Sequence, residues 1–347
     1  MKVKRILTVV LVLMITALAL TGCGGSDTDS SGENGLPEKV TIAMQPLTSV
    51  GIIPVQEDGF SKMDVTAEVK NFDSGRDMVN ALTSDSVDFA MMLGICPTTV
   101  GLTSGSDYKI IWVDCLIRDS EGLVVRENSG IKDVRDLKGK KVGVTTASSG
   151  HYGLLCALED AGMSAEDIEI VDLQPDAINS AWQRGDIDAA YTWNPTLINL
   201  KNNGGNVLLT GADLAEKGHQ TVNFHVVRTE FAEQYPELVK QYCSVLADAA
   251  ALYESDPDKA YEIVGAYHEL SVDETKEQMS DEYVTLENQL SDEAFGNDTI
   301  AKNILEVAEF MKEQGEIEDA KDLEFFKNAI DTSYIEALLA EQQETEE

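Results

Sequence analysis

The sequence has 347 residues and a formal net charge of −36, with 62 acidic side chains against 26 Lys and Arg. Such a chain repels nucleic-acid phosphates and anionic lipid headgroups, so we exclude both as partners. The length suits two lobes of ordinary size. The four histidines never pair at helical spacing and the cysteines show no metal-ligand spacing, so we expect neither a metal site nor a cofactor.

The first residues predict a signal peptide over residues 1–22. A short cationic segment ending at Arg5 precedes an apolar run, Ile6 to Leu20, which is short for a membrane span. The stretch Leu20-Thr21-Gly22-Cys23 resembles the bacterial lipoprotein cleavage box. That resemblance implies that Cys23 is lipidated, and the two chains of a diacylated cysteine would anchor the protein on the outer face of the cell membrane. The alternative is an ordinary signal peptide with a chance cysteine.

Residues 23–36 are rich in Gly, Ser, Asp, Asn and Glu, which predicts a flexible tether. Short β-rich runs then alternate with helical ones. The first series of strands and helices covers 39–44, 48–57, 64–70, 74–83, 87–92, 97–103 and 109–115. After a hinge-like stretch, a second series covers 142–145, 151–161, 168–172, 175–184, 187–191, 195–202 and 207–209. Strands separated by helices predict an α/β protein whose sheets are of the parallel type, with helical crossovers.

The two series match over residues 81–90 and 181–190. Each segment ends a helix, turns, and enters a strand through a β-branched residue followed by Asp. We interpret this as two lobes of one design, although a chance match would look the same. Lobe I is predicted over residues 37–119 and 224–347, and lobe II over residues 120–223.

Beyond Phe224 the apolar spacing predicts a helical C-terminal region that packs on lobe I. Its predicted helices cover residues 236–253, 257–267, 272–287 and 299–313, followed by an acidic frayed tail. The widely spaced Cys96, Cys115, Cys156 and Cys243 remain if Cys23 is lipidated. Cys115 and Cys156 are interpreted as small buried hydrophobes, and a disulfide stays an alternative.

Several motifs then resemble the taurine, aliphatic sulfonate and nitrate family of substrate-binding proteins of ABC importers, above all its taurine-binding members. They include 137–144, 148–155, 171–175, 181–193, 72–75 and 310–315. The resemblance covers about Lys39 to Leu338 and is densest in the second lobe. It implies a two-lobed type II periplasmic binding protein without catalytic residues. We therefore expect a monomer that captures a small sulfonate, zwitterion or anion and delivers it to a permease and its ATPase.

The segment Ser148, Ser149, Gly150 and His151 is predicted to bind this ligand. It lies where a strand ends and a helix begins, so unpaired N–H groups and serine hydroxyls supply donors for an anion. A serine that only caps its own helix is the alternative. Trp193, at the carboxyl end of a strand, is expected to face the cleft, whereas Tyr191 is expected to lie in the core.

The resemblance also suggests ligand contacts for Gln45, at the end of the first strand, and for Glu121, which would pair with a ligand ammonium. A solvated carboxylate at the crossing between lobes is the alternative for Glu121.

Four further candidates depart from the taurine-binding pattern. Ile95 and Cys96 stand where that pattern has two serines, Asn223 replaces an acidic residue, and His225 replaces an aromatic one. These changes weaken the inference to taurine itself. Two other functions remain open: a binding lobe that feeds a sensor kinase, and a desulfinase-like enzyme in which Cys96, at a helix start, is the nucleophile.

Overall fold

The computed structural model describes residues 35–346 of the chain. Residues from Lys39 onward form one compact unit, and the following account concerns that unit. The predicted signal peptide, the predicted lipidation at Cys23 and residues 24–34 of the predicted tether lie outside the described residues. Within residues 35–346, no helix is both long enough and apolar enough to cross a bilayer.

The first sheet has the strand order β11-β4-β10-β3-β1-β2. Its strands are β1 (Lys39–Met44), β2 (Thr66–Asn71), β3 (Phe89–Gly94), β4 (Tyr108–Leu116), β10 (Val222–Arg228) and β11 (Glu282–Tyr283). Strand β1 pairs in parallel with β2 and β3, whereas β10 runs antiparallel to β3 and β4. Every residue of β3 is buried, as expected of a strand in the middle of a covered sheet.

The second sheet has the strand order β7-β6-β8-β5-β9. Its strands are β5 (Glu121–Arg126), β6 (Lys141–Val144), β7 (Glu169–Asp172), β8 (Ala189–Trp193) and β9 (Gly205–Thr210). Strand β6 pairs in parallel with β7 and β8, and β5 runs antiparallel to β8 and β9. The two sheets with their crossover helices confirm the predicted α/β class.

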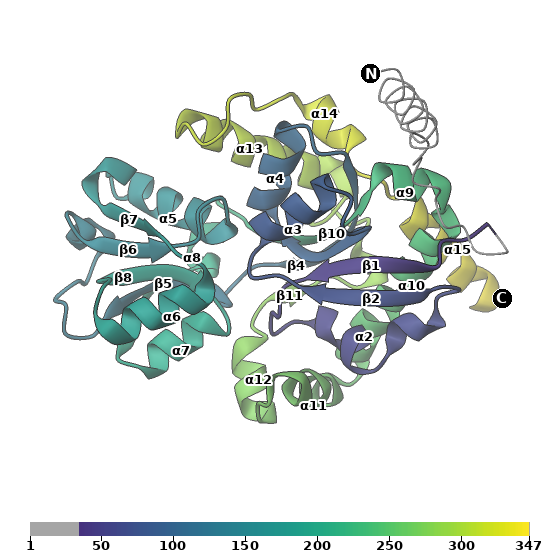
Figure 1. The fold of residues 1–347 in the computed structure, drawn as a ribbon, viewed down its shortest axis with the longest axis horizontal. Coiled ribbons are helices and arrows are strands. Elements are labelled where there is room, and N and C mark those ends of the chain that lie inside the picture. Colours follow the sequence, from purple (N-terminus) through teal and green to yellow (C-terminus); the bar gives the residue numbers. More distant parts are fainter. Residues whose placement is uncertain (1–34, 347) are drawn as a thin grey trace, which may run out of the picture. The chain divides into compact units, whose positions relative to one another are not determined.

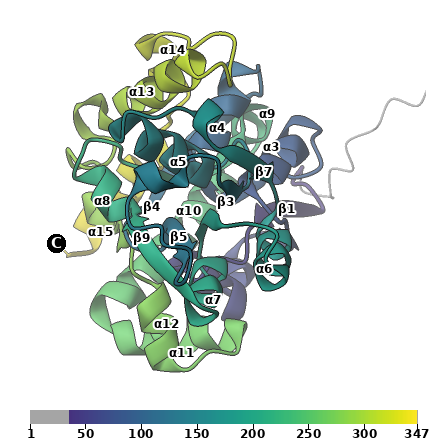
Figure 2. The same cartoon turned by 90° about the vertical axis from the view of Figure 1, so that its left-hand side faces the viewer.

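Helices cover both sheets (Figure 1). Around the second sheet lie α5 (Ser149–Asp160), α6 (Pro175–Arg184), α7 (Thr196–Asn202) and α8 (Gly211–Ala215), which face the viewer in Figure 2. The helices that accompany the first sheet early in the chain are α2 (Ile53–Gln56), α3 (Gly75–Thr83) and α4 (Ile95–Thr103). The C-terminal helices are α9 (Thr229–Gln234), α10 (Pro236–Ser255), α11 (Pro257–His268), α12 (Val272–Gln278), α13 (Thr299–Glu313), α14 (Leu323–Asn328) and α15 (Ser333–Glu346).

Short 3₁₀ turns complete the fold. They are η1 (Val50–Ile52), η2 (Gly59–Lys62), η3 (Val134–Leu137), η4 (Ala165–Asp167), η5 (Leu286–Asn288) and η6 (Gly296–Asp298). The predicted helix over residues 48–57 is therefore a 3₁₀ turn followed by a single α-helical turn.

The matching segments, residues 81–90 and 181–190, make equivalent hydrogen bonds in the two sheets. Asp88, just before β3, accepts a hydrogen bond of 2.8 Å from the backbone N–H of Thr41 in β1. Asp188, just before β8, accepts one of 2.9 Å from the backbone N–H of Lys141 in β6. The backbone N–H of each Asp donates in turn to the carbonyl of the same partner. Each aspartate therefore fixes the register of two neighbouring parallel strands.

Three predicted features were wrong in detail. Strands β5 and β10 were not predicted, and because both enter a sheet directly from a crossing segment, without a preceding crossover helix, both sheets are mixed and not purely parallel. The predicted helix over residues 272–287 ends at Gln278 and gives way to β11, which pairs with β4. Met279, Tyr283 and Leu286 kept a spacing of four and three residues there, which resembles a helix.

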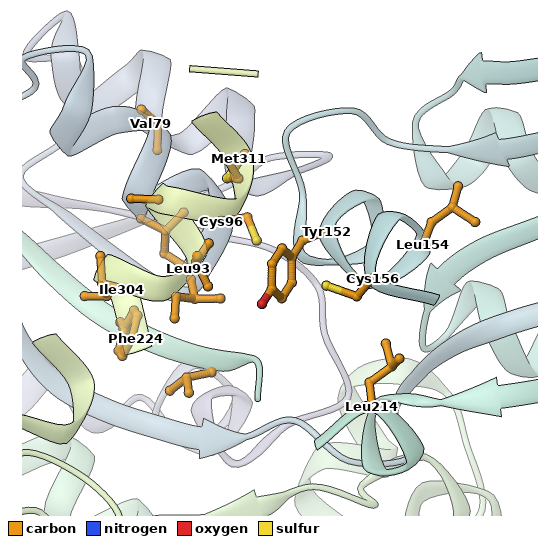
Figure 3. Packing of buried hydrophobic residues seen from close by; sticks show 14 of the residues in the cluster. Val79, Leu93, Cys96, Tyr152, Leu154, Cys156, Leu214, Phe224, Ile304 and Met311 are labelled. Carbon is orange, nitrogen blue, oxygen red and sulfur yellow. The ribbon is translucent and has the colours of Figure 1, made fainter. Parts of the chain in front are cut away.

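The four cysteines beyond Cys23 are all buried and none forms a disulfide. Figure 3 shows Cys96 of α4 and Cys156 of α5 close to the ring of Tyr152. Tyr152 also meets Phe310 of α13 edge to face, with ring centroids 5.2 Å apart. Helices that follow strands of different sheets therefore share one apolar core, and these cysteines serve in it as small hydrophobic residues.

Candidate functional site

A cavity that is partly open to solvent is lined by residues from both halves of the molecule. Its lining comprises Gln45, Leu47, Thr48, Ser49, Gly75, Gly94, Pro97, Ile117, Ser120, Glu121, Ser148, Ser149, Trp193, Asn194, Asn223 and Asp281. Six of the sequence-predicted site residues therefore lie at one cavity: Gln45, Glu121, Ser148, Ser149, Trp193 and Asn223.

Helix starts are concentrated around this cavity. Gly94 is the N-cap of α4, Ser148 is the N-cap of α5, and Gly75 is the first residue of α3. The 3₁₀ turn η1 begins after its N-cap, Ser49. The first N–H groups of a helix have no partner within it, and the helix dipole is positive at that end. The starts of the three helices α3, α4 and α5 thus offer uncharged donors to a bound anion.

The structure is compatible with both predicted roles of the Ser148 segment, as a source of donors for a ligand and as a helix cap. Its Oγ accepts a hydrogen bond of 3.2 Å from the backbone N–H of His151 and donates one of 2.6 Å to the carbonyl of Thr145. The hydroxyl of Ser148 therefore caps α5, which leaves the first backbone N–H groups of the helix as donors toward the cavity.

The hydroxyl of Ser149 is hydrogen-bonded to a carboxylate. It donates a hydrogen bond of 2.6 Å to Oε2 of Glu121. Glu121 is 2% exposed, and its other oxygen, Oε1, is buried without a hydrogen-bond partner among the described residues. Burial is the main cause that raises the pKa of Glu121 to about 8; the Ser149 hydrogen bond opposes the shift and the charge of Asp281 adds to it. Glu121 is thus a buried carboxylate, not a solvated one.

Trp193 lies at the cavity, whereas Tyr191 lies in the core. Trp193 is half-buried, lines the cavity and is the register partner of Glu121 across β5 and β8. Tyr191 is completely buried, and a Cβ added at Gly153 of α5 would lie 2.5 Å from its hydroxyl. Gly153 therefore allows α5 to pack closely on β8. An aromatic ring at the cavity wall suits the methylene part of a small ligand.

Asp281 was not predicted from the sequence. It lies between α12 and β11, and its Oδ1 accepts a hydrogen bond of 2.8 Å from the backbone N–H of Arg118. Its Oδ2 accepts one of 2.6 Å from the hydroxyl of Ser120. Desolvation is the main cause that raises the pKa of Asp281 to about 6. No local motif marks this residue, because it reaches the cavity only through the pairing of β11 with β4.

His225 lies outside this cavity. Its ring is completely buried, with Nε2 3.3 Å from Oδ1 of Asp114 and Nδ1 2.9 Å from the hydroxyl of Tyr242. Asp114 also accepts a hydrogen bond of 3.2 Å from Ser49, which lines the cavity. One register shift in the pairing of β10 with β4, between Asn223 and Phe224, separates His225 from Asn223. His225 therefore supports the wall from behind through Asp114 and Ser49.

Four other predicted residues do not line the cavity either. Ile95 and Cys96 are completely buried in the apolar core, so the walls at the start of α4 are Gly94 and Pro97. Burial raises the pKa of Cys96 well above its ordinary value, which is the opposite of what a thiolate nucleophile needs. Gly150 packs against Tyr191, and His151 accepts from the backbone N–H of Ala147.

Polar contacts join the two sheets at the rim of the cavity. Nη1 of Arg76 in α3 lies 3.2 Å from Oδ2 of Asp172 at the end of β7. Nε2 of Gln174 donates to Oγ of Ser74 at 3.3 Å. On another side, Nδ2 of Asn194 donates a hydrogen bond of 3.1 Å to the carbonyl of Gln278. Hydrogen bonds and one partly exposed ion pair thus bridge the two halves of the molecule near the cavity.

Two α/β halves with a cavity between their sheets define the class of periplasmic binding folds. An alkanesulfonate-binding protein, SsuA from Xanthomonas axonopodis pv. citri, solved with bound MOPS, superposes with a TM-score of 0.74 at 20% identity, covering 86% of this chain and 99% of that one. The periplasmic aliphatic sulphonate-binding protein SsuA from Escherichia coli gives a TM-score of 0.65 at 25% identity over 83% and 96% of the two chains.

Sequence comparison agrees with the fold. The taurine-binding periplasmic protein of Escherichia coli K12 is 34% identical over 286 residues, which cover 80% of this chain and 87% of that protein. The NMT1/THI5-like family model matches residues 51–260. The chain belongs to the NMT1/THI5-like family, and its relatives include sulfonate-binding and taurine-binding proteins. The sequence motifs predicted this relationship to sulfonate-binding and taurine-binding proteins.

Proposed function

We propose that this protein is the substrate-binding lipoprotein of an ABC importer and that it captures a small organosulfonate, such as taurine, in the cavity between its two sheets. The observation that carries the proposal is the convergence of helix starts from both halves on that cavity. A sulfonate has three acceptor oxygens and one delocalised negative charge, so it suits several N–H donors of helix starts. The sulfonate-binding relatives support the same substrate class.

The proposed lobes are residues 37–119 with 224–347, and residues 120–223. The polypeptide passes between the sheets after β4 and before β10, where Asp281 and Ser120 meet. The rim contacts of Arg76 and Gln174 join the lobes on one side, and that of Asn194 on another. Closure would bury the ligand and favour the form that the permease recognises, while opening would break these polar contacts and would also separate Tyr152 of α5 from Phe310 of α13.

The proposal places the mature chain, as a monomer, on the outer face of the cell membrane, held by acyl chains on Cys23. Mass spectrometry of the N-terminal peptide tests the anchor. We expect a diacylated Cys23 on the purified membrane form. For Cys23→Ala we expect loss of the membrane-bound form. An unmodified cysteine at residue 23 in membrane-bound protein would contradict the anchor without affecting the binding proposal.

Ligand-dependent thermal unfolding tests the substrate. A chain that lacks residues 1–22 and carries Cys23→Ser is screened against alkanesulfonates, aminosulfonates, sulfate esters, amino acids and nitrate. We expect Tm to rise with small sulfonates, because a ligand that binds only the folded state stabilises it by about 2.7 kcal/mol at 100 times Kd. Trp193→Ala is the matched control and should unfold like the parent without ligand. A chain that no sulfonate stabilises would overturn the substrate class.

A further inference from the structure

The cavity has an unusual balance of charge for an anion site. Glu121 and Asp281 both line it, whereas none of its described lining residues is Lys, Arg or His. The uncharged N–H groups of the helix starts offset an anion but do not neutralise a carboxylate in a buried site. The lining therefore supplies no positive charge that would stabilise the ionised forms of these two carboxyl groups, and a cationic group on the ligand would supply it.

One carboxylate oxygen of Glu121 accepts no hydrogen bond from the described residues. Its Oε2 is used by Ser149, but Oε1 is buried and has no partner among the described residues. Buried polar atoms are nearly always hydrogen-bonded, and a buried carboxylate oxygen without a donor is costly. A donor on a bound ligand would satisfy this atom.

Asp281 stands beside Glu121 at the crossing between the sheets. It holds the hydroxyl of Ser120, the residue next to Glu121 in the chain. The charge of Asp281 also contributes, after burial, to the raised pKa of Glu121. The two carboxylates thus repel each other, and an ammonium group between them would relieve this repulsion while donating to Oε1 of Glu121.

We infer that Asp281 completes an ammonium site with Glu121, whose pairing with a ligand ammonium the resemblance to taurine-binding proteins already implies, and that Asp281 makes the cavity select aminosulfonates over sulfonates without an amine. This inference rests on the proposed binding function and deepens it. It assigns two roles within the cavity: the N–H groups of the helix starts hold the anion, and the carboxylates hold the ammonium group, with Ser149 next to both kinds of group. The wall at Trp193 covers the short carbon chain between them.

Asn223 provides a geometric test of this role. Its Nδ2 lies 3.7 Å from the sulfur of Cys115, and the same sulfur lies 3.8 Å from Oδ2 of Asp281. Position 223, in β10, and position 281, just before β11, therefore approach one thiol of β4 from the two sides of that strand, and both line the cavity. A carboxylate at position 223 would face the same ligand end, so Asn223→Asp is expected to replace Asp281.

The experiment measures Kd by calorimetry at pH 8 for 2-aminoethanesulfonate and 2-hydroxyethanesulfonate. The parent should prefer the amine by about tenfold or more, because a charge-assisted hydrogen bond is stronger than a neutral one. Asp281→Asn should lower that preference by about tenfold and change Kd for the hydroxyl ligand less than about threefold. The double variant D281N/N223D should recover most of the preference. Rescue of this kind is not expected if Asp281 only positions Ser120 and Arg118.

Other results overturn the inference. Equal loss of both ligands in D281N without rescue would show that Asp281 acts on the fold of the crossing segment. A matched pair, 3-aminopropanoate and 3-hydroxypropanoate, separates the two proposals. If only these carboxylates bind and the amine is preferred, the sulfonate assignment fails while the ammonium site stands. If sulfonates bind without any amine preference, the ammonium site fails while the binding function stands. If none of the four probes binds, both fail.

Discussion

Ser149 donates a 2.6 Å hydrogen bond to Glu121, which joins the first residue of α5 to the first residue of β5. Ser149 therefore belongs to both kinds of group at the cavity, the helix starts and the carboxylates. It begins a helix whose N–H groups suit an anion, and its hydroxyl is hydrogen-bonded to a buried carboxylate. The resemblance to taurine-binding proteins indicated both residues but not their contact.

Replacing Ser149 by Ala removes the hydrogen bond that lowers the pKa of Glu121. The pKa of Glu121 should then rise further, and the affinity for 2-aminoethanesulfonate at pH 7 should fall by about tenfold, as for loss of a hydrogen bond to a charged group. Calorimetry between pH 6 and pH 9 checks this. Ser164→Ala, at the start of a 3₁₀ turn outside the cavity lining, is the control; an equal effect there would contradict the coupling.

The stability of the ligand-free protein should fall as pH rises from 6 to 8. The pKa of Glu121 is raised from 4.5 to about 8, so the folded state holds this proton more tightly than the unfolded state. Its contribution is fully present below pH 4.5 and is lost as pH rises through about 8, with a slope of at most about 1.4 kcal/mol per pH unit. Asp281 acts with the same sign at lower pH, because its pKa is raised from 3.8 to about 6.

Urea unfolding at several pH values measures this slope. Glu121→Gln should flatten the curve between pH 6 and pH 8, whereas Glu127→Gln, exposed just beyond the same strand, should leave it unchanged. The groups whose charges act on Glu121 or respond to it are Asp281, Tyr191 and Cys96. A curve that stays steep in Glu121→Gln would assign the titration to another group.

Tyr191 and Trp193 should respond differently to truncation. The hydroxyl of Tyr191 is buried without a hydrogen-bond partner among the described residues, so Tyr191→Phe should keep or raise Tm and leave Kd unchanged. Trp193→Ala should weaken ligand binding by about tenfold or more, as expected of a buried aromatic contact, with a small change in Tm. Thermal unfolding and calorimetry on both variants distinguish the roles; a large loss of affinity in Tyr191→Phe would reverse the assignment.

Asp188 should contribute to stability through the start of β6. Asp188→Ala removes the acceptor of the Lys141 N–H and should lower the free energy of unfolding by about 1–2 kcal/mol. Asp186→Ala is the matched control in the same turn, because it removes only an exposed ion pair with Arg184 and should cost less than about 0.5 kcal/mol. Urea unfolding checks both, and equal costs would argue against the register role.

The sequence predicted those parts of the fold that depend on local patterns. The alternation of strands and helices, and the matching Asp88 and Asp188, follow from short-range spacing and hydrogen bonds within one sheet. Strands β5 and β10 were missed because they follow crossing segments without a helix, and β11 was missed because its apolar spacing continues that of α12. Pairing of strands distant in the sequence carries no local signal.

The same distinction applies to the site. Ser149 and Trp193 lie in dense motifs at the carboxyl ends of strands, and the cavity is built there. Asp281 arrives through a two-residue strand far along the chain. His225 was expected at the ligand because it stands where the taurine-binding pattern has an aromatic residue, but the irregular pairing of β10 with β4 places it behind the wall, with Asp114 and Tyr242.

The described lining of the cavity contains no Lys and no Arg, and this affects which anions can compete with the ligand. Inorganic sulfate or phosphate would meet the same helix starts but would leave both carboxylates uncompensated. A guanidinium-lined site attracts every oxyanion in the surrounding medium, whereas the proposed ammonium site would favour those that carry an amine. Mineral anions in large excess would thus leave it free for a scarce organic solute.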